Sequence, residues 1–436
     1  MQKVRDLSIM MCFAIAFCYS CEEKGNSGKF GDPYDSSKPV VLGSFEPDSG
    51  GMATKLFITG SNFGNDPTAV KVYYNDKQAS VVGTDGNHLY VITPRQPGES
   101  CTISVVVGKD SVTFKDKQFK YRTMTTVKTV TGTKGTTTFK EGTLATATFG
   151  NPYGICIDAE GNIFVSNWNG GANFVLINEE QDIVRALSTA TERLGVPTPD
   201  KDGKVISVPT DPGDGFYSFD PDVQWEVKKR LILHPSAEAQ AAGAMDFTIN
   251  WKTCMTVSPF DGYIYTASFS GPLIKMDPVT RMGQRVGNEI ISTGSMQNIA
   301  ADPFRPNILY ISFQTRHAIY TYDLLTNKHE LYAGIPGLAG YKDGSRLEAQ
   351  FNAPYQMVVD RDSSLVIADY DNQCIRKISR DGIVSTLIGK GGVRGYQDGN
   401  AEDALFDRPN GVAVDKDYNI YIADYYNNCV RKLAIE

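Results

Sequence analysis

The sequence predicts an all-β protein in which a β-sandwich precedes a β-propeller. Short apolar segments alternate with turns rich in Gly, Asn, Asp and Pro along most of the 436 residues. One strand–turn–strand pattern recurs in the C-terminal two thirds of the chain at spacings typical of propeller blades. A second, unrelated set of alternating strands fills the region before these repeats. Hydrophobic residues make up 41% of the chain, which is sufficient for packed cores.

The repeats are clearest in three stretches. They begin at Phe149 with F-G-N-P-Y-G-I-C-I-D, at Phe351 with F-N-A-P-Y-Q-M-V-V-D and at Phe406 with F-D-R-P-N-G-V-A-V-D. The aspartates that end these motifs are 202 and 55 residues apart, and the upstream sequences F-K-E-G, Y-K-D-G and Y-Q-D-G keep the same two spacings. One such small sheet cannot bury both faces without neighbours on either side, which predicts a propeller.

Weaker copies of the pattern cover residues 256–269 and 299–313. A degraded unit between about Gly203 and Asn250, with three strand-like segments, brings the expected number of blades to six. The last unit ends at Glu436 without an outer strand. We expect residues 127–132, which precede the first unit, to supply that strand and close the ring, because closure removes open sheet edges.

Two segments carry a family resemblance. A-D-Y-D-N-Q-C-I-R-K-I from Ala368 and A-D-Y-Y-N-N-C-V-R-K-L from Ala423 resemble the signature of NHL-repeat propellers, and the resemblance extends over residues 125–436. It implies a structural role for the Asp, Asn and Arg of each motif: Asp369, Asn372, Arg376, Asp424, Asn427 and Arg431. It implies a fold and a binding face but no particular reaction.

Residues 38–122 form the predicted sandwich domain. The sequence E-P-D-S-G-G followed by I-T-G-S-N-F-G resembles the TIG/IPT immunoglobulin-like family, in which the module often serves as a spacer. Gly60 and Gly64 flank a turn for which we expect positive φ angles.

The chain begins with a basic M-Q-K-V-R followed by a short apolar run, which is typical of a secretory signal peptide over residues 1–21. C-Y-S-C resembles a lipoprotein cleavage site with Cys21 as the lipidated residue, and 22–37 is a flexible tether. Glu22 and Glu23 resemble the surface-export signal of Bacteroidetes lipoproteins. We therefore expect an outer-membrane protein, held by its lipid anchor alone and facing the cell exterior.

Charge and composition exclude some functions. A net charge of −7 and the absence of a basic run argue against nucleic-acid binding. Only four histidines are present, and no C-x-x-C follows the leader, so we expect neither a metal nor another cofactor. Five cysteines remain after the leader. Their odd number and scatter favour buried thiols, with a Cys374–Cys429 disulfide as the alternative.

The second strand of each recognisable unit ends in a polar residue followed by an aromatic one, so five blades present a ring at an equivalent place on one face. Rings beside carboxylates and carboxamides suit carbohydrate. The alternative is that these rings pack between blades or cover the channel, with the polar residues in the scaffold. The predicted glycan-binding residues are Trp168, Phe269, Phe313, Tyr370 and Tyr425, with Asn167, Asp369 and Asp424, and with Tyr153 and Tyr355 at the channel mouth.

A catalytic propeller would need acidic or histidine side chains pointing into its channel. The innermost strands offer Asn298, Gln356 and Asn410 there instead, and His234 is the least excluded catalytic residue. We therefore predict a non-catalytic glycan-capture protein, resembling those of Bacteroidetes polysaccharide-uptake systems. A carbohydrate hydrolase or lyase, and a protein scaffold for an outer-membrane glycan transporter, remain alternatives. Residues 194–250, with Trp251 just beyond, carry either grafted specificity or a blade with an extra loop.

Overall fold

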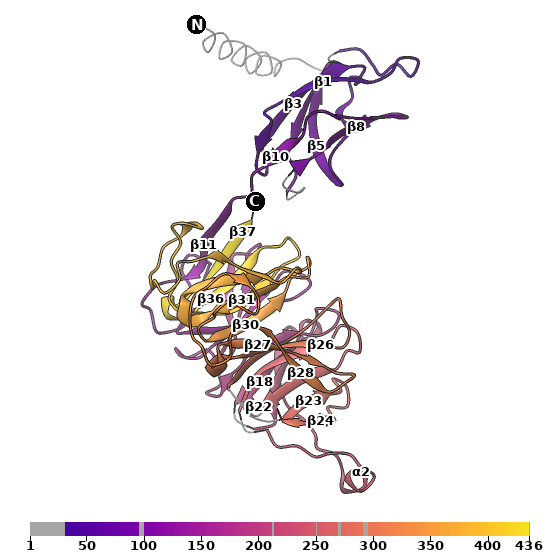
Figure 1. Cartoon of the computed structure of the whole chain (residues 1–436). Helices are drawn as coiled ribbons and strands as arrows, with labels where there is room; N and C mark the ends of the chain where they lie inside the picture. The colour runs from indigo at the N-terminus through magenta and orange to yellow at the C-terminus, as the bar shows by residue number, and fades with distance from the viewer. Residues whose placement is uncertain are drawn as a thin grey trace. The chain divides into compact units, whose positions relative to one another are not determined.

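The computed structural model describes residues 31–95, 100–211, 213–249, 251–268, 272–290 and 295–435. These residues separate into two compact units, one extending to Thr123 and the other from Met124 to Ile435 (Figure 1). The leader with Cys21 lies outside the described residues, as does Phe269. Within these ranges, no helix combines the length and the apolar character needed to cross a membrane.

The first unit is a β-sandwich, as predicted. Its larger sheet has the order β1-β3-β6-β5-β4-β8-β9 and its smaller sheet the order β2-β10-β7. Alternate side chains of the strands point into one apolar core, which contains Phe45, Tyr74 and Phe119. The elements are β1 (Val41–Glu46), β2 (Ser49–Gly50), β3 (Lys55–Ser61), η1 (Pro67–Ala69), β4 (Val70–Tyr74), β5 (Lys77–Thr84), β6 (His88–Ile92), β7 (Ser100–Cys101), β8 (Ile103–Val107), β9 (Asp110–Thr113) and β10 (Phe119–Tyr121).

Only one of the two turn glycines has the expected backbone conformation. Gly64 has φ +78°, which glycine adopts without strain. The prediction was wrong for Gly60, whose φ is not positive. Glycine is required there for space, because a Cβ atom would lie 2.2 Å from the carbonyl oxygen of Val41.

In the second unit, the described strands form six antiparallel sheets of four main strands each, and these strands are consecutive in the chain except in the last sheet, where β11 joins β35, β36 and β37. This confirms the propeller prediction. The first three sheets comprise β12 (Pro152–Ile157), β13 (Ile163–Asn167), β14 (Phe174–Asn178) and β15 (Ile183–Ser188); β16 (Arg193–Leu194), β17 (Thr198–Pro199), β18 (Ile206–Asp211), β19 (Gly215–Asp220) and β20 (Glu226–Leu231); and β21 (Lys252–Val257), β22 (Ile264–Ser268), β23 (Pro272–Met276) and β24 (Gly283–Ile290).

The other three sheets follow the same plan. They comprise β25 (Met296–Ala301), β26 (Ile308–Phe313), β27 (Ala318–Asp323) and β28 (Lys328–Ala333); β29 (Gly344–Ser345), β30 (Pro354–Val359), β31 (Leu365–Asp369), β32 (Cys374–Ile378) and β33 (Ile383–Ile388); and β34 (Gly399–Asn400), β35 (Pro409–Val414), β36 (Ile420–Asp424), β37 (Cys429–Ile435) and β11 (Thr125–Gly132). The short helices are η2 (Pro221–Val223), α2 (Ala237–Ala241), η3 (Gln314–Arg316), η4 (Tyr370–Asn372) and η5 (Tyr425–Asn427).

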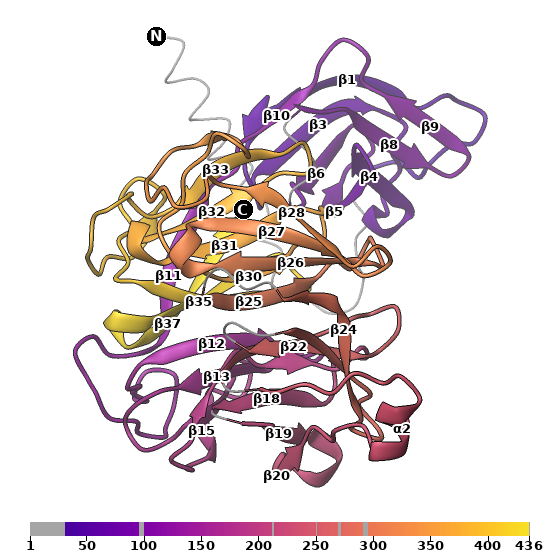
Figure 2. The same ribbon diagram turned by 60° about the horizontal axis from the view of Figure 1, so that its bottom comes forward.

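The sheets form a ring around their innermost strands. β35 lies beside both β12 and β30, β25 lies between β30 and β21, and the ring continues through β18 and β17 back to β12. In Figure 2 the inner strands β12, β25, β30 and β35 occupy the middle of this unit, and β15, β20 and β33 lie towards its outside. The inner strands β12, β25 and β35 are almost completely buried, as expected where the neighbouring sheets cover both faces of a blade.

The degraded unit is a complete sheet with boundaries that differ from those predicted. Its three strand-like segments are β18, β19 and β20, as expected. Its innermost strand lies earlier in the chain, where β16 and β17 share one edge of β18. Pro197 lies in the gap between β16 and β17, where it cannot donate to a ladder. The extra loop is residues 232–249, which contain α2.

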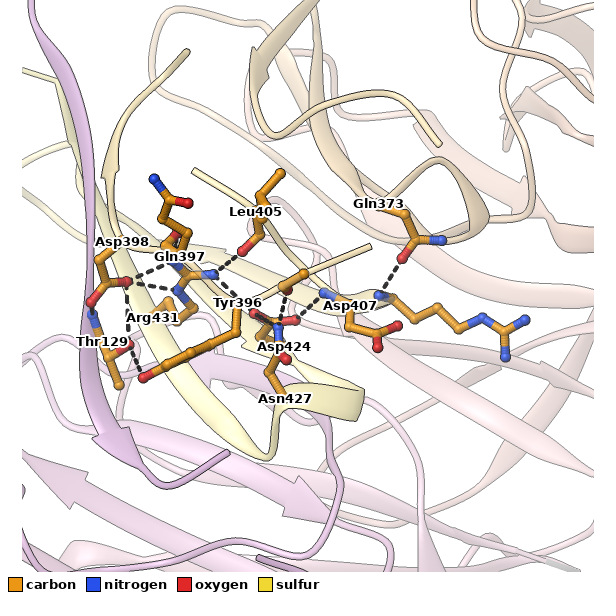
Figure 3. Close-up of polar contacts among 12 residues, drawn as sticks. Thr129, Gln373, Tyr396, Gln397, Asp398, Leu405, Asp407, Asp424, Asn427 and Arg431 are labelled. Atoms are coloured by element: carbon orange, nitrogen blue, oxygen red, sulfur yellow. Dashed lines mark hydrogen bonds and ion pairs between the residues drawn. The ribbon is translucent and has the colours of Figure 1, made fainter. Parts of the chain in front are cut away.

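The ring closes as predicted, through β11. This strand runs antiparallel to β37, from the pair Thr125 and Ile435 to the pair Gly132 and Cys429. The closing strand is also held by Asp398, whose carboxylate accepts a hydrogen bond from the backbone N–H of Thr129 at 2.8 Å (Figure 3).

A buried arginine links this closure to the blade interior. Arg431 donates to the carboxylates of Asp398 and Asp424 and to the carbonyl oxygens of Gln397 and Leu405 (Figure 3). Arg376 makes the corresponding contacts to Asp369 and Asp343 in the preceding blade.

All five cysteines of the described residues are free and buried, which confirms the expectation of buried thiols rather than a Cys374–Cys429 disulfide.

We expect Arg431→Leu to destabilise the second unit by about 3–5 kcal/mol, because it leaves the buried carboxylate of Asp424 without its cation. Urea unfolding followed by tryptophan fluorescence would measure the loss. Arg380→Leu is the matched control: Arg380 is exposed, so its substitution should change stability by less than about 0.5 kcal/mol. Equal stability of the two variants would contradict this role of Arg431.

Candidate functional site

Three of the predicted aromatic positions occupy equivalent places in the ring. Trp168, Tyr370 and Tyr425 each follow the last residue of a second strand. Phe313 instead ends β26 and pairs with Met296, one residue earlier in the register, so Gln314 holds the equivalent place in that blade. In the blade with the interrupted inner strand, the equivalent residue is Asp211. Thr210 pairs with Leu194 of the inner strand, as Asn167 pairs with Pro152 in the first blade. The residue after Thr210, Asp211, therefore corresponds to Trp168, the residue after Asn167. Sequence reasoning missed Asp211 because the pattern is degraded there.

Most of these rings come together in one cluster at the channel mouth. Tyr153 stacks on Trp168 with ring centroids 3.9 Å apart, and Tyr355 stacks on Tyr370 at 4.4 Å. Tyr425 lies between the two pairs, 6.2 Å from Trp168 and 6.5 Å from Tyr370. Tyr153 is buried, whereas the other four are half-buried. The cluster is therefore partly a covering of the channel and partly an accessible surface.

Phe313 lies apart from this accessible surface. It is buried and packs edge-on against Tyr320, with ring centroids 5.3 Å apart. Phe313 therefore belongs to the core between blades. This is the alternative to glycan binding that the sequence left open for the aromatic positions. Phe269, the fifth predicted ring, lies outside the described residues.

The three polar candidates beside these rings belong to the scaffold. Asn167 is buried and donates to the carbonyl oxygens of Asn169 and Ala172. Asp369 and Asp424 have no exposed surface, and each accepts hydrogen bonds from one backbone N–H, one asparagine and one arginine. Burial raises the pKa of each carboxyl to about 6, although the arginine favours the charged form. Neither carboxylate presents an oxygen to a ligand.

A cavity of about 380 Å³ opens beside the aromatic cluster. Rings line one part of it and polar side chains line the rest, which is the usual character of a small-ligand site. The inner strands contribute to its wall the residues Tyr153, Arg193, Leu194, Lys252, Thr253, Gln297 and Tyr355. The remaining lining residues are Trp168, Gly195, Asp211, Trp251 and Gln314.

Lys252 is the unexpected member of this wall. It begins β21 and is only 1% exposed, yet among the described residues its Nζ has no hydrogen-bond partner. The same holds for Oδ1 of Asp211. Burial lowers the pKa of Lys252 to about 8, although the negative charges of Asp214 and Asp211 act to raise it. Burial also raises the pKa of Asp211, while Lys252 and Arg193 oppose the change.

Trp225 and Trp251, which lie before and after the extra loop 232–249, have different surroundings. Trp225 is half-buried and packs against Phe164, with ring centroids 4.9 Å apart. Trp251 is 55% exposed and lines the cavity next to Lys252. Trp168 is less accessible, because Tyr153 covers one of its faces and the guanidinium of Arg193 lies 5.3 Å from its ring centroid. Trp251 is therefore the more open aromatic surface in this site.

The channel interior offers little to a catalytic mechanism. Gln356 donates to the carbonyl oxygens of Ile155 and Val412, and Asn298 accepts from the N–H of Met357, so both side chains tie inner strands together. Across the described residues, no three His, Cys, Asp or Glu side chains are grouped so as to hold a metal. His234 lies outside the cavity wall and contacts Asp246 at 2.7 Å and Asp214 at 3.2 Å.

Family models match both parts of the chain. Residues 40–121 match the IPT/TIG domain and residues 406–433 match the NHL repeat. The chain therefore contains an IPT/TIG domain and, in its last blade, an NHL repeat. None of the curated proteins matches this sequence.

Solved structures share the fold over nearly the whole chain. A structural genomics protein of unknown function from Bacteroides thetaiotaomicron has a TM-score of 0.74 at 24% identity, covering 93% of this chain and 100% of its own. An auxiliary nutrient binding protein from Bacteroides ovatus has a TM-score of 0.63 at 23% identity, covering 93% and 100%. Another auxiliary nutrient binding protein, from B. thetaiotaomicron, has 0.61 at 22% identity, covering 93% and 99%.

We expect Lys252→Met to stabilise the protein by about 1–3 kcal/mol at pH 7. The substitution removes an ammonium whose burial in the folded state costs desolvation free energy. The folded pKa lies below that of the unfolded chain, so wild-type stability should rise between about pH 8 and pH 10.5, and the advantage of the variant should shrink over that window. Denaturant unfolding at pH 7 and pH 10 measures both effects.

Lys416→Met is the matched control for this prediction. Lys416 is exposed in the turn between β35 and β36, at the far end of these strands from the cavity mouth, so its substitution should have little effect at either pH. A lower stability of Lys252→Met than of wild type at pH 7 would show that the ammonium is paired in solution.

Proposed function

We propose that this protein is a non-catalytic, cell-surface lipoprotein that captures glycan at the cavity beside the aromatic cluster. The observation that carries the proposal is the composition of that cavity wall. It combines exposed and half-buried rings, Trp251, Trp168 and Tyr355, with polar side chains, and of these Lys252 and Asp211 have atoms without a hydrogen-bond partner among the described residues. The sandwich unit serves as a spacer between a membrane anchor and the propeller.

The chemistry of this wall suits a sugar. The C–H faces of pyranose rings pack on flat aromatic surfaces, while their hydroxyl groups need directional hydrogen-bond partners. Around the same opening, Oδ1 of Asp211 and Nζ of Lys252 have no hydrogen-bond partner among the described residues. Gln314 and Thr253 also line the opening, although Gln314 accepts from Gln297 and the hydroxyl of Thr253 donates to the carbonyl oxygen of Met296. The volume of about 380 Å³ falls within the range of roughly 300–1,000 Å³ common for small-ligand sites. We infer that a short segment of a longer chain is held there.

The structural neighbours support a binding role. Two proteins with the same fold from Bacteroides carry the name auxiliary nutrient binding protein, and each is covered almost completely by the likeness. At 22% and 23% identity the likeness demonstrates the fold alone. We propose that this chain shares a nutrient-binding role with them, and that its nutrient is a glycan.

We expect Trp251→Ala to weaken glycan binding about tenfold, because it removes an exposed ring that can stack on a sugar without removing core packing. A glycan array on the mature protein identifies the ligand, and affinity electrophoresis or calorimetry then compares the variants. The same mixtures should release no new reducing ends.

Phe260→Ala and Phe304→Ala are matched controls for Trp251→Ala. Each ring is 50% exposed, and both lie in turns at the far end of the inner strands from the cavity. These variants should bind as wild type does. Equal losses in all three variants, or undiminished binding by Trp251→Ala, would remove the cavity from the proposal.

We also propose that Cys21 carries the lipid anchor and that the protein faces outward from the outer membrane. The support is the leader, with its basic start, apolar run and C-Y-S-C ending before Glu22 and Glu23. Cys21→Ala should abolish incorporation of labelled fatty acid and release the protein from the membrane fraction.

The outward orientation has its own test. In intact cells, wild-type protein should be degraded by added protease, and its survival would contradict outward display.

A further inference from the structure

The cavity wall carries an unbalanced charge. Its ionisable residues, apart from tyrosines, are Arg193, Lys252 and Asp211, which amount to two cations and one carboxylate. This local excess of positive charge occurs in a chain whose net charge is −7. A neutral sugar would need no such excess, so the charge itself calls for an explanation.

Lys252 is the residue in which this charge is concentrated. Its side chain is 99% buried, it lines the cavity, and its Nζ lacks a hydrogen-bond partner among the described residues. A buried ammonium without a partner is costly, and a ligand oxygen that bears negative charge is the group that stabilises it most. Arg193 lies on the same wall at the aromatic edge, where its guanidinium is within 5.3 Å of the Trp168 ring centroid.

The carboxylates near Lys252 attract its ammonium but make no hydrogen bond to it. Oδ1 of Asp211 has no hydrogen-bond partner among the described residues, so it makes no hydrogen bond to the ammonium. Asp214, the other carboxylate that acts on Lys252, contacts the imidazole of His234 at 3.2 Å and is not part of the cavity wall. Asp211 would repel a doubly charged group, which limits the expected ligand to a single negative charge.

We propose that the cavity selects glycans that carry singly charged anionic groups, with the ammonium of Lys252 holding one such group and the aromatic wall holding the sugar ring. This inference rests on the proposed glycan-binding function. The anionic group is a carboxylate, as in a uronic acid, or a sulfate ester. Both present negatively charged oxygens to an ammonium, and both carry one charge near neutral pH.

The test compares matched pairs of probes that differ only in charge. Oligogalacturonate is paired with its methyl ester, and a sulfated galactan oligosaccharide is paired with its desulfated form. Calorimetry should show that wild-type protein binds one of the acidic probes at least tenfold more tightly than its neutral partner. The pair that shows the difference identifies the anionic group.

Variants assign the preference to Lys252. Lys252→Met should lower affinity for the acidic probe about 10- to 100-fold, as expected for a lost hydrogen bond to a charged group. Its affinity for the neutral partner should stay within about threefold of wild type, which excludes unfolding as the cause. Lys416→Met, with the same charge change in an exposed turn, should leave the preference intact.

The outcomes separate the two proposals. Equal binding of acidic and neutral probes, or a preference that survives Lys252→Met, would overturn the anion selectivity and leave glycan binding standing. If neither these probes nor any sugar on a glycan array binds, the glycan-binding function fails and the selectivity fails with it.

Discussion

The pairing of β11 with β37 is the constraint on which the second unit depends. Without it, the first and last sheets of the ring would each lack a partner, and the last blade would expose an unpaired edge. The two paired strands are about three hundred residues apart in the sequence, so closure is entropically costly and needs strong local contacts. Arg431 and Asp398 supply them by joining the closing strand to the blade interior.

A closed ring also determines where a ligand can bind. Because every inner strand starts at the same end of the channel, one position per blade lines the same opening. The blades use that position differently: Trp168, Tyr370 and Tyr425 supply rings, and Asp211 supplies a carboxylate. Gly195 takes the place that Tyr153 holds in the first blade, because a Cβ atom there would lie 2.3 Å from the carbonyl oxygen of Thr253. The cavity opens where this large ring is missing.

Sequence reasoning predicted the parts that repetition makes visible. The sandwich, the propeller, the closing strand and the aromatic positions all follow from apolar periodicity and fixed offsets. The inner strand at Arg193–Leu194 and Thr198–Pro199 could not be found in this way, because Pro197 and the residues around it break the pattern. The sequence pattern also left open whether Asp369 and Asp424 bind ligand or belong to the scaffold, since only the fold shows that each is paired with a buried arginine.

Lys252 shows why the site, unlike the fold, required the structure. A lysine at the start of a strand is ordinarily exposed, and nothing in its neighbours predicts burial. The fold itself does not need this ammonium, because Pro152, Pro354 and Pro409 hold the corresponding ladder position in three other blades. Elsewhere in the repeats, buried Arg376 and Arg431 each meet an aspartate. A charge that the scaffold neither requires nor pairs is best explained by what enters the cavity beside it.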